Sequence, residues 1–190
     1  MHLSDFDYTL PPERIAQQPV EPRDHSRLLH LKRATQEICH RHFYDLPQLL
    51  QPGDVLVIND TKVLPVRLFG QKTTGGKVEV LLTKKLHGAG QTETWEALTK
   101  PGLKPGQTVV VSNDQASLQI TCQEMQAYTR TVVVSTESAD VLQALYHLGE
   151  MPTPPYIKAF VGDPERYQTI FATHPGSAAA PTAGLHFTPE

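Results

Sequence analysis

The sequence predicts a mixed α/β core with a small antiparallel β-barrel domain inserted into it. A fully apolar, β-branched run at 55–58 is typical of a strand buried on both faces. Short strands separated by Gly, Pro and Asn-Asp turns fill 66–134 without a helical pattern, and helical periodicity returns after them. We therefore expect a core formed by 1–64 and 141–190, with the barrel domain at 65–140.

The first fifty residues predict short elements, because prolines interrupt anything longer. A short helix is expected over 11–15, where two prolines and a glutamate begin it. The segments 27–31 and 37–41 flank a polar turn and predict a β-hairpin. A second short helix is expected over 43–50.

The apolar run at 55–58 stops abruptly at Asn59, Asp60 and Thr61. A polar triplet at the end of a central strand is where a sheet commonly presents groups that bind a ligand. The alternative is a strand-ending turn, in which the Asn and Asp side chains accept hydrogen bonds from backbone N–H groups. The substrate site is the favoured interpretation, because the triplet follows a strand predicted to be buried.

Within the barrel domain, Gly75 and Gly76 stand before an alternating strand. Their backbone could cradle an anion, but Gly-Gly in this position is the usual sequence of a hairpin turn, which we favour. Glu79 on the following strand is expected to face the interior or a site. The six predicted strands are Val66–Gly70, Lys77–Thr83, Thr94–Leu98, Thr108–Val111, Leu118–Cys122 and Thr131–Val134.

After the barrel domain, apolar residues at helical spacing predict a helix over 141–148, which Gly149 ends. A further helix is expected over 163–171, because Asp163 can cap it and a proline occupies its first turn. The same cap-and-proline pattern stands at 188–190. We therefore expect a further C-terminal portion, so that the return segment of the core is truncated.

The composition limits the classes of partner. A formal net charge of −3 and a pI near 6.3 exclude the global positive field that drives tight non-specific binding of nucleic acid. Any contact with RNA is therefore expected to be local. A solvated face is favoured over an RNA-facing patch for the clustered basic residues, which are Arg23, Arg27, Lys32, Arg33, Arg41, Lys84, Lys85 and Lys100.

The two cysteines, Cys39 and Cys122, match neither a disulfide framework nor a zinc-ligand spacing, which favours the reducing cytoplasm. No targeting segment is expected, and no apolar stretch approaches the roughly 18 residues of a membrane span. Only His40 and His42 of the segment 39–42 share a strand face, so we expect no metal site there.

Motifs spread over the whole chain occur in a fixed order: Phe6-Asp7-Tyr8, Leu10-Pro11, Ile15-Ala16-Gln17, Pro22–Leu29, Gly53–Val63, Thr74–Glu79, Pro154–Ile157, Arg166–Thr169 and Ala179–Thr188. Together they resemble the N-terminal motifs of the S-adenosylmethionine:tRNA ribosyltransferase-isomerases. Several ordered blocks are more specific than one short motif. Thr153 and Ala178 depart from the family pattern as packing variants, and the family's C-terminal motifs are absent, which puts activity of this chain alone in question.

The resemblance implies a mixed α/β core with an inserted β-barrel. It also implies a reaction, in which the ribosyl part of S-adenosylmethionine is transferred and isomerised onto 7-aminomethyl-7-deazaguanine at the tRNA wobble position. Adenine and methionine leave, and epoxyqueuosine is formed. The implied partners are tRNA and S-adenosylmethionine as co-substrate, with no other cofactor and no membrane, and the full-length protein is expected to be a monomer.

The candidate catalytic residues are His186 and Asp60. The reaction needs a base to remove a proton beside the sulfonium and an acid to assist departure of adenine, and an imidazole performs either task near neutral pH. A lone His is more often structural, and the family motif brings the two interpretations level. The candidate substrate-binding residues are Arg23, Asp24, Arg27, Asn59, Thr61, Gly75, Gly76, Glu79, Tyr156, Arg166, Tyr167, Thr182, Gly184 and Phe187.

Some of these candidates keep two interpretations. Arg23 and Arg27 near Asp24 suit bidentate recognition of the methionine carboxylate or the tRNA backbone, or an ion-pair network that fixes the N-terminal segment. Tyr156 and Tyr167 stack on adenine or on the flipped base, or pack in the core. Two other classes of function also remain: a module that binds tRNA without turnover, and a structural fragment that must dimerise or swap segments to bury apolar surface.

Overall fold

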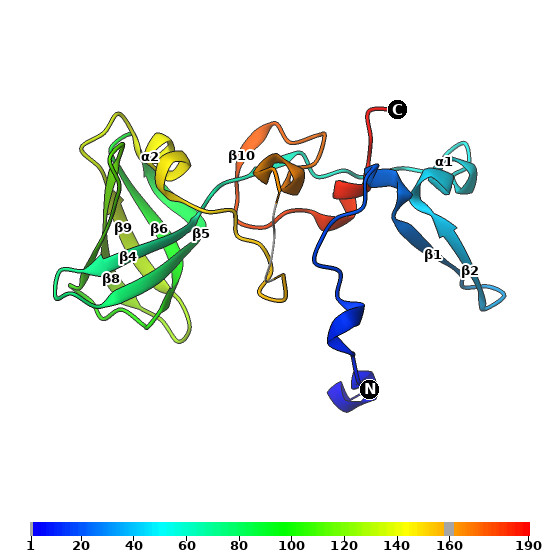
Figure 1. The fold of residues 1–190 in the computed structure, drawn as a ribbon, viewed down its shortest axis with the longest axis horizontal. Helices are drawn as coiled ribbons and strands as arrows, with labels where there is room; N and C mark the ends of the chain where they lie inside the picture. Colours follow the sequence, from blue (N-terminus) through cyan, green and yellow to red (C-terminus); the bar gives the residue numbers. More distant parts are fainter. Residues whose placement is uncertain (1, 158–161) are drawn as a thin grey trace. The chain divides into compact units, whose positions relative to one another are not determined.

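The computed structural model describes residues 2–157 and 162–190 (Figure 1). These residues are mostly β, with a closed six-stranded barrel and few helices. Contacts between residues divide the chain into two units, and the barrel lies in unit 2. Unit 1 is Met1–Asp54, Thr153–Asp163 and His186–Glu190, and unit 2 is Val55–Pro152 and Pro164–Leu185.

The barrel confirms all six strands predicted from the sequence. Neighbouring strands pair antiparallel in the order β4-β5-β6-β9-β8-β7, and β7 pairs with β4 to close the sheet. Closure leaves no unpaired edge, which is one way in which small β domains avoid edge-to-edge association. The strands are β4 Arg67–Lys72, β5 Lys77–Ala89, β6 Thr92–Lys100, β7 Thr108–Ser112, β8 Ser117–Met125 and β9 Arg130–Ser135.

Alternation of side chains along each strand fills the barrel interior. On β5, Val78, Val80 and Leu82 are buried, and the residues between them face outward. The same alternation on β8 and β9 buries side chains such as Ile120 and Val134. Because side chains of a strand point alternately to opposite faces, this pattern places one apolar face of every strand inside the barrel.

At Gly70, β4 approaches β7 closely. A Cβ added there would lie 2.5 Å from the carbonyl oxygen of Val110 and 2.7 Å from the side chain of Val109. Glycine in a strand interior commonly marks such a close approach of two backbones. The absent side chain at Gly70 therefore allows the barrel to close.

The helix predicted at 141–148 is confirmed as α2, Val141–Leu148. The carboxylate of Asp140 accepts a hydrogen bond from the backbone N–H of Gln143 at 2.7 Å and caps the first turn. Ala144 and Leu145 are fully buried and belong to the same apolar cluster as the barrel interior. The backbone N–H of Gly149 donates to the carbonyl of Leu145 and ends the helix.

A second, small sheet joins the chain before the barrel to the chain after it. In this sheet β3, Thr61–Val63, pairs in parallel with β10, His174–Ser177. The buried side-chain amide of Gln168 accepts a hydrogen bond from the N–H of Val63 at 2.9 Å and donates one to its carbonyl at 2.8 Å. Both backbone groups of Val63 are thus satisfied at the end of the short strand.

Two predicted elements are wrong. The run 55–58 is not a strand, and Val55 and Val57 are 86% and 87% exposed. Within the described residues no strand lies beside it, and pairing begins only at Thr61. The helix expected over 163–171 is only a 3₁₀ turn, η5 Pro164–Tyr167, because the next residues turn toward β3 to place the Gln168 amide.

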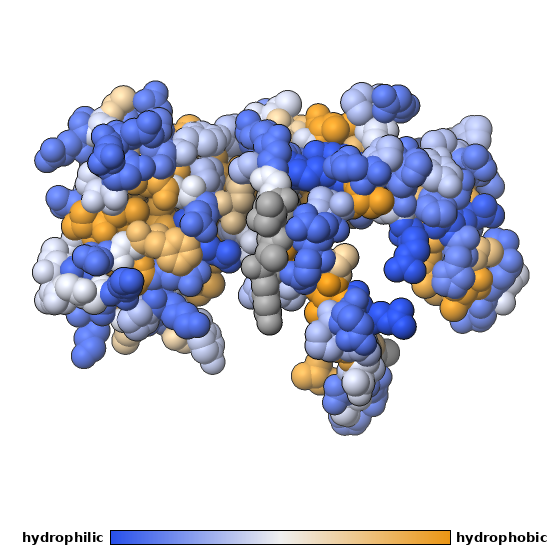
Figure 2. All heavy atoms as spheres, viewed as in Figure 1, coloured by the Kyte–Doolittle hydropathy of each residue, from blue (hydrophilic) through white to orange (hydrophobic). Residues whose placement is uncertain are grey.

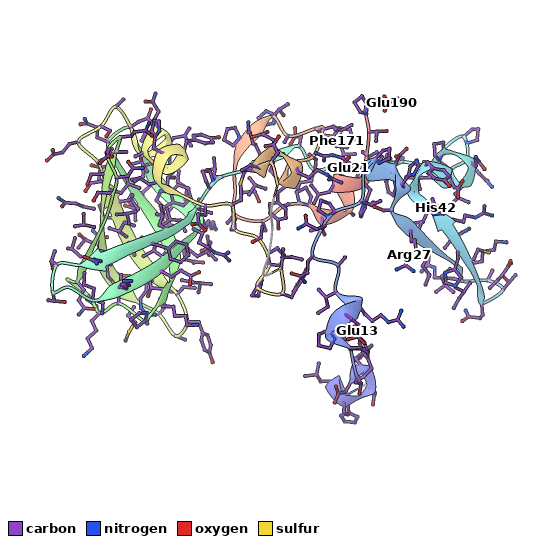
Figure 3. The ribbon with its side chains drawn as sticks, viewed as in Figure 1. Glu13, Glu21, Arg27, His42, Phe171 and Glu190 are labelled. Atoms are coloured by element: carbon purple, nitrogen blue, oxygen red, sulfur yellow. The ribbon has the colours of Figure 1, made fainter. Side chains whose placement is uncertain are left out.

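Unit 1 contains the predicted hairpin, formed by β1 Arg27–Lys32 and β2 Glu37–His42. Arg27 and His42 stand opposite each other at its base, as Figure 3 shows. The ion pair of Lys32 with Glu37 at 2.8 Å lowers the pKa of the Glu37 carboxyl and raises the pKa of Lys32. The remaining elements are η1 Leu3–Phe6, η2 Pro12–Arg14, η3 Arg23–His25, η4 Phe43–Asp45 and α1 Leu46–Leu49.

These short elements meet the sequence predictions in part. The helix expected over 43–50 is present as η4 followed by α1, whereas the one expected over 11–15 is the single 3₁₀ turn η2. Across 2–157 and 162–190, no helix is both long and apolar enough to cross a membrane.

Replacing Gly70 with Ala is expected to destabilise the barrel by about 1–3 kcal/mol, because the new methyl group forces β4 away from β7. Urea unfolding followed by far-UV circular dichroism measures this loss. Gly76→Ala is the matched control, because an added Cβ there meets only the Lys72 side chain, at 4.0 Å. A Gly70→Ala protein as stable as the control would contradict the role given to the close approach.

The two thiols are expected to differ sharply in reactivity. Cys122 is 1% exposed inside the barrel, and burial raises the pKa of its thiol, whereas Cys39 is only half-buried. Because the thiolate is the reactive form, a disulfide reagent at mildly alkaline pH should modify Cys39 rapidly and Cys122 only when the barrel opens. Cys39→Ser should remove the fast phase and Cys122→Ser the slow one. A fast reaction of Cys122 would contradict the closed barrel.

Candidate functional site

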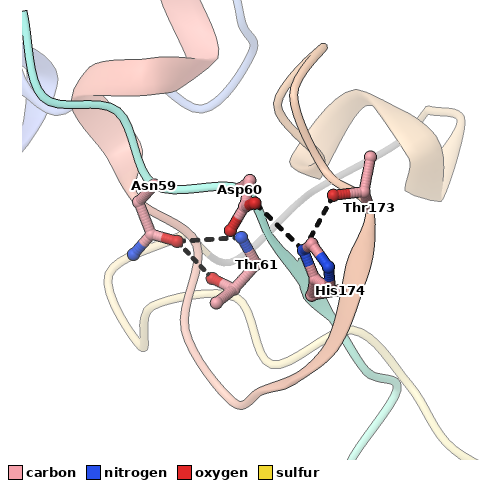
Figure 4. A network of polar contacts seen from close by, with 5 residues as sticks. All are labelled: Asn59, Asp60, Thr61, Thr173 and His174. Carbon is pink, nitrogen blue, oxygen red and sulfur yellow. Dashed lines mark hydrogen bonds and ion pairs between the residues drawn. The ribbon is translucent and has the colours of Figure 1, made fainter.

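The parallel pairing of β3 with β10 brings Asp60 and His174 together, although they are 114 residues apart in the chain (Figure 4). The backbone N–H groups of Thr173 and His174 both donate to the carbonyl of Asp60, at 2.8 and 3.1 Å. The Nδ1 atom of His174 lies 2.9 Å from Oδ2 of Asp60. Backbone and side-chain contacts therefore hold the same pair.

A carboxylate next to Nδ1 of an imidazole favours the tautomer that carries its proton on Nδ1, which leaves Nε2 with a lone pair. The Thr173 hydroxyl lies 3.0 Å from the same nitrogen. The side chains of His174 and Asp60 are 76% and 53% exposed, so the pair is open to a ligand. This arrangement can take up a proton at Nε2 and stabilise the imidazolium that results.

The neighbours of Asp60 have a different role. The side-chain oxygen of Asn59 accepts hydrogen bonds from the backbone N–H of Thr61 at 2.9 Å and from its hydroxyl at 2.6 Å (Figure 4). The Asn59 side chain thus accepts a backbone hydrogen bond, as the alternative interpretation predicted, but the turn precedes β3 and does not end a strand. Of the predicted triplet, Asp60 is the member whose carboxylate contacts the imidazole of His174.

Sequence reasoning did not identify His174. The sequence feature that could have marked it as a candidate is its position directly before Pro-Gly, just ahead of the motif that contains Thr182 and His186. The neighbour across the sheet could not be inferred, because the strand was predicted at 55–58 and the pairing lies at 61–63.

His186 and Phe187 lie in unit 1, where both rings pack on Phe43. The ring centres of His186 and Phe43 are 5.4 Å apart, and those of Phe187 and Phe43 are 4.9 Å apart in an edge-to-face arrangement. The His186 imidazole is thus part of an aromatic cluster.

Thr182 and Gly184 of the same motif belong to unit 2 and to the 3₁₀ turn η6, Thr182–His186. A Cβ at Gly184 would lie 2.9 Å from the methyl carbon of Thr169. The small residue therefore serves a close approach between two segments of the protein itself.

Arg23, Asp24 and Arg27 lie at the start of the hairpin in unit 1. The hydroxyl of Ser26 donates to the carbonyl of Arg23 at 2.9 Å. The Oδ1 atom of Asp24 is buried and has no hydrogen-bond partner among the described residues, and the side chain of Arg27 is exposed.

Gly75 and Gly76 form the turn between β4 and β5, as the hairpin interpretation predicted. The N–H of Gly75 donates to the carbonyl of Lys72, and Gly75 has a φ of +98°, which glycine adopts without strain. Glu79 faces outward, not into the barrel, and its carboxylate lies 3.3 Å from Nε of Arg67.

Three other predicted residues lie elsewhere in the units. Tyr156 is 53% exposed in unit 1, where its carbonyl accepts a hydrogen bond from the side chain of Gln17 at 3.0 Å. Arg166 and Tyr167 end the 3₁₀ turn η5 of unit 2 and are both half-buried.

Comparison with known proteins identifies relatives over the whole chain. The family model described as queuosine biosynthesis protein matches residues 3–190. S-adenosylmethionine:tRNA ribosyltransferase-isomerase of Moorella thermoacetica is 51% identical over 192 residues, covering 100% of this chain and 55% of that protein. The protein of the same name from Synechococcus elongatus is 50% identical, covering 100% of this chain and 53% of the relative.

A solved structure is also similar. The crystal structure of S-adenosylmethionine tRNA ribosyltransferase from Thermotoga maritima has 34% sequence identity and a TM-score of 0.37, covering 97% of this chain and 51% of that one. The chain thus spans about half the length of the relatives that it matches.

The tautomer of His174 is expected to depend on Asp60. In the unmodified protein Nδ1 should carry the proton, and Asp60→Ala should shift the neutral imidazole toward the form protonated on Nε2, because the acceptor is lost. Long-range ¹H–¹⁵N NMR distinguishes the two forms. Thr173→Val is the control and should leave the tautomer unchanged. An unchanged tautomer in Asp60→Ala would show that the carboxylate does not orient the ring.

Proposed function

The chain belongs to the queuosine biosynthesis protein family, and from that premise we propose that it forms part of an S-adenosylmethionine:tRNA ribosyltransferase-isomerase. The enzyme transfers and isomerises the ribosyl moiety of S-adenosylmethionine onto 7-aminomethyl-7-deazaguanine at the tRNA wobble position. Epoxyqueuosine is formed, and adenine and methionine are released. The support is a relationship near 50% identity over the full length of the chain.

The observation that carries a catalytic role is the contact of Asp60 with His174 at 2.9 Å. Ribosyl transfer from a sulfonium requires removal of a proton from the carbon beside the sulfur and delivery of a proton to the departing adenine. Nε2 of His174 is suited to take the first proton, with Asp60 stabilising the imidazolium. His186 is proposed as the second acid/base group.

Binding roles are proposed on the same basis. Arg23 and Arg27 offer guanidinium groups to the methionine carboxylate or to a tRNA phosphate, with Asp24 between them. Tyr156 and Tyr167 offer aromatic faces to adenine or to the flipped base. Further contacts with substrate are proposed for Asn59, Thr61, Gly75, Gly76, Glu79, Arg166, Thr182, Gly184 and Phe187.

The architecture proposed for the whole protein is a mixed α/β domain formed by 1–64 and 141–190, into which a barrel domain at 65–140 is inserted. The parallel pairing of β3 with β10 supports it, because parallel strands are typical of α/β sheets and these two lie on either side of the barrel in the sequence. The enzyme is proposed to be a cytoplasmic monomer that uses tRNA and S-adenosylmethionine and no further cofactor.

Adenine release from S-adenosylmethionine, in the presence of tRNA that carries the 7-aminomethyl-7-deazaguanine wobble base, tests the function. It should be measured with this chain and with a version extended to the length of its relatives. His174→Ala in the extended protein is expected to lower kcat by about 10²–10⁴-fold, the usual contribution of a positioned acid/base group. Asp60→Asn should lower kcat less, because it keeps the contact and removes the charge.

His87→Ala is the control, because His87 is an exposed histidine on β5 that has no proposed role. It should release adenine at the unmodified rate. No release by either version of the protein would overturn the proposed reaction. Normal release by His174→Ala, together with a loss in His186→Ala, would transfer the acid/base role to His186.

A further inference from the structure

The outer surface of the barrel carries a pocket, whose lining includes only Glu79 of the residues proposed above to contact substrate. It has a volume of about 620 Å³ and lies over β4, β5, β7 and the end of β6. Its lining includes Phe69, Gln71, Lys77, Glu79 and Lys100. Figure 2 shows that apolar side chains reach the surface of the barrel between hydrophilic ones.

The strand register fixes how the lining residues stand. Phe69 on β4 lies directly opposite Glu79 on β5, and Glu79 lies opposite Lys100 on β6. Gln71 stands opposite Lys77 in the next outward row. Opposed residues of neighbouring strands have Cβ atoms about 5 Å apart, so Glu79 is the direct neighbour of Phe69, and Lys77 and Lys100 lie beyond it on the same face.

Phe69 is 53% exposed, although it is a large apolar residue in the middle of a strand. Its outward position follows from alternation, because Leu68 before it is buried in the barrel. Large aromatic residues are usually buried, and an exposed one beside a pocket is typical of a contact surface.

The charges around Phe69 are positive on balance. The side chains of Lys77 and Lys100 are exposed, and the one carboxylate among them, that of Glu79, lies 3.3 Å from Nε of Arg67. The chain as a whole has a formal net charge of −3, so this surface differs from the average. A local positive surface in an acidic protein favours an anionic partner over non-specific association.

We propose that the pocket binds an unpaired segment of RNA, with one base stacked on Phe69 and backbone phosphates contacting Lys77 and Lys100. Proteins that bind single-stranded nucleic acid combine a positive groove with exposed aromatic rings, often on the face of a small β-barrel. The choice of RNA as the anion rests on the proposed function. The side chain of Gln71 adds a donor and an acceptor for a base edge.

Fluorescence anisotropy of a labelled anticodon stem–loop RNA, titrated with residues 1–190, tests the proposal. Phe69→Ala should weaken binding by about tenfold, within the range of base stacking on an aromatic side chain, and should not change the salt dependence. Lys77→Ala and Lys100→Ala should each reduce the slope of log K against log salt by about 0.7.

Matched controls use residues of the same types outside the pocket. Tyr128→Ala removes an aromatic side chain that is 88% exposed, and Lys104→Ala removes an exposed lysine from the turn between β6 and β7. Both should leave the dissociation constant unchanged. Near-native circular dichroism of each variant shows that the barrel remains folded.

Several outcomes would overturn the proposal: no RNA binding by the chain, normal binding by Phe69→Ala, or an equal loss in the controls. A dimer in sedimentation that Phe69→Ala dissociates would also overturn it, because the face would then join two copies. Adenine release by the extended protein with Phe69→Ala binding RNA normally would reject the pocket and leave the proposed reaction standing.

Discussion

The pair of hydrogen bonds between the Gln168 amide and the backbone of Val63 is the contact on which the candidate site depends. It joins residues 105 positions apart, on either side of the barrel, and satisfies both polar groups of a buried backbone unit. An unpaired polar group in such a position would cost several times the net value of one hydrogen bond. With both hydrogen bonds formed, β3 and β10 lie in register, and Asp60 is held against His174.

The barrel could be predicted from the sequence because the residues that specify each strand lie within that strand or in the turns beside it. Each strand alternates buried and exposed residues, as Val78, Val80 and Leu82 show, and each is bounded by turn residues such as Gly75. The helix at 141–148 was predictable for the same reason, since its cap, its apolar face and its stop are neighbours in sequence.

The flanking segments were harder to predict because their structure depends on distant partners. The run 55–58 has the composition of a buried strand, but strand formation also requires a neighbour, and the described residues supply none. Asp60 was selected as a candidate because it follows that run. His174 was not selected because only the parallel pairing of β3 with β10 places it beside Asp60. That pairing cannot be inferred from the spacing of the two residues in the sequence.

The position of the barrel between Asp60 and His174 has a consequence for the order of folding. Bringing two residues 114 positions apart together in a flexible chain costs about 4 kcal/mol of loop-closure entropy. Once the barrel has folded, the flexible part of the chain between Asp60 and His174 is shorter, because the barrel strands are already ordered. The small parallel sheet is therefore expected to close after the barrel has folded and to open before it. The Asp60–His174 pair, and the acid/base chemistry proposed for it, would thus form only once the barrel has folded, although the barrel contributes neither side chain.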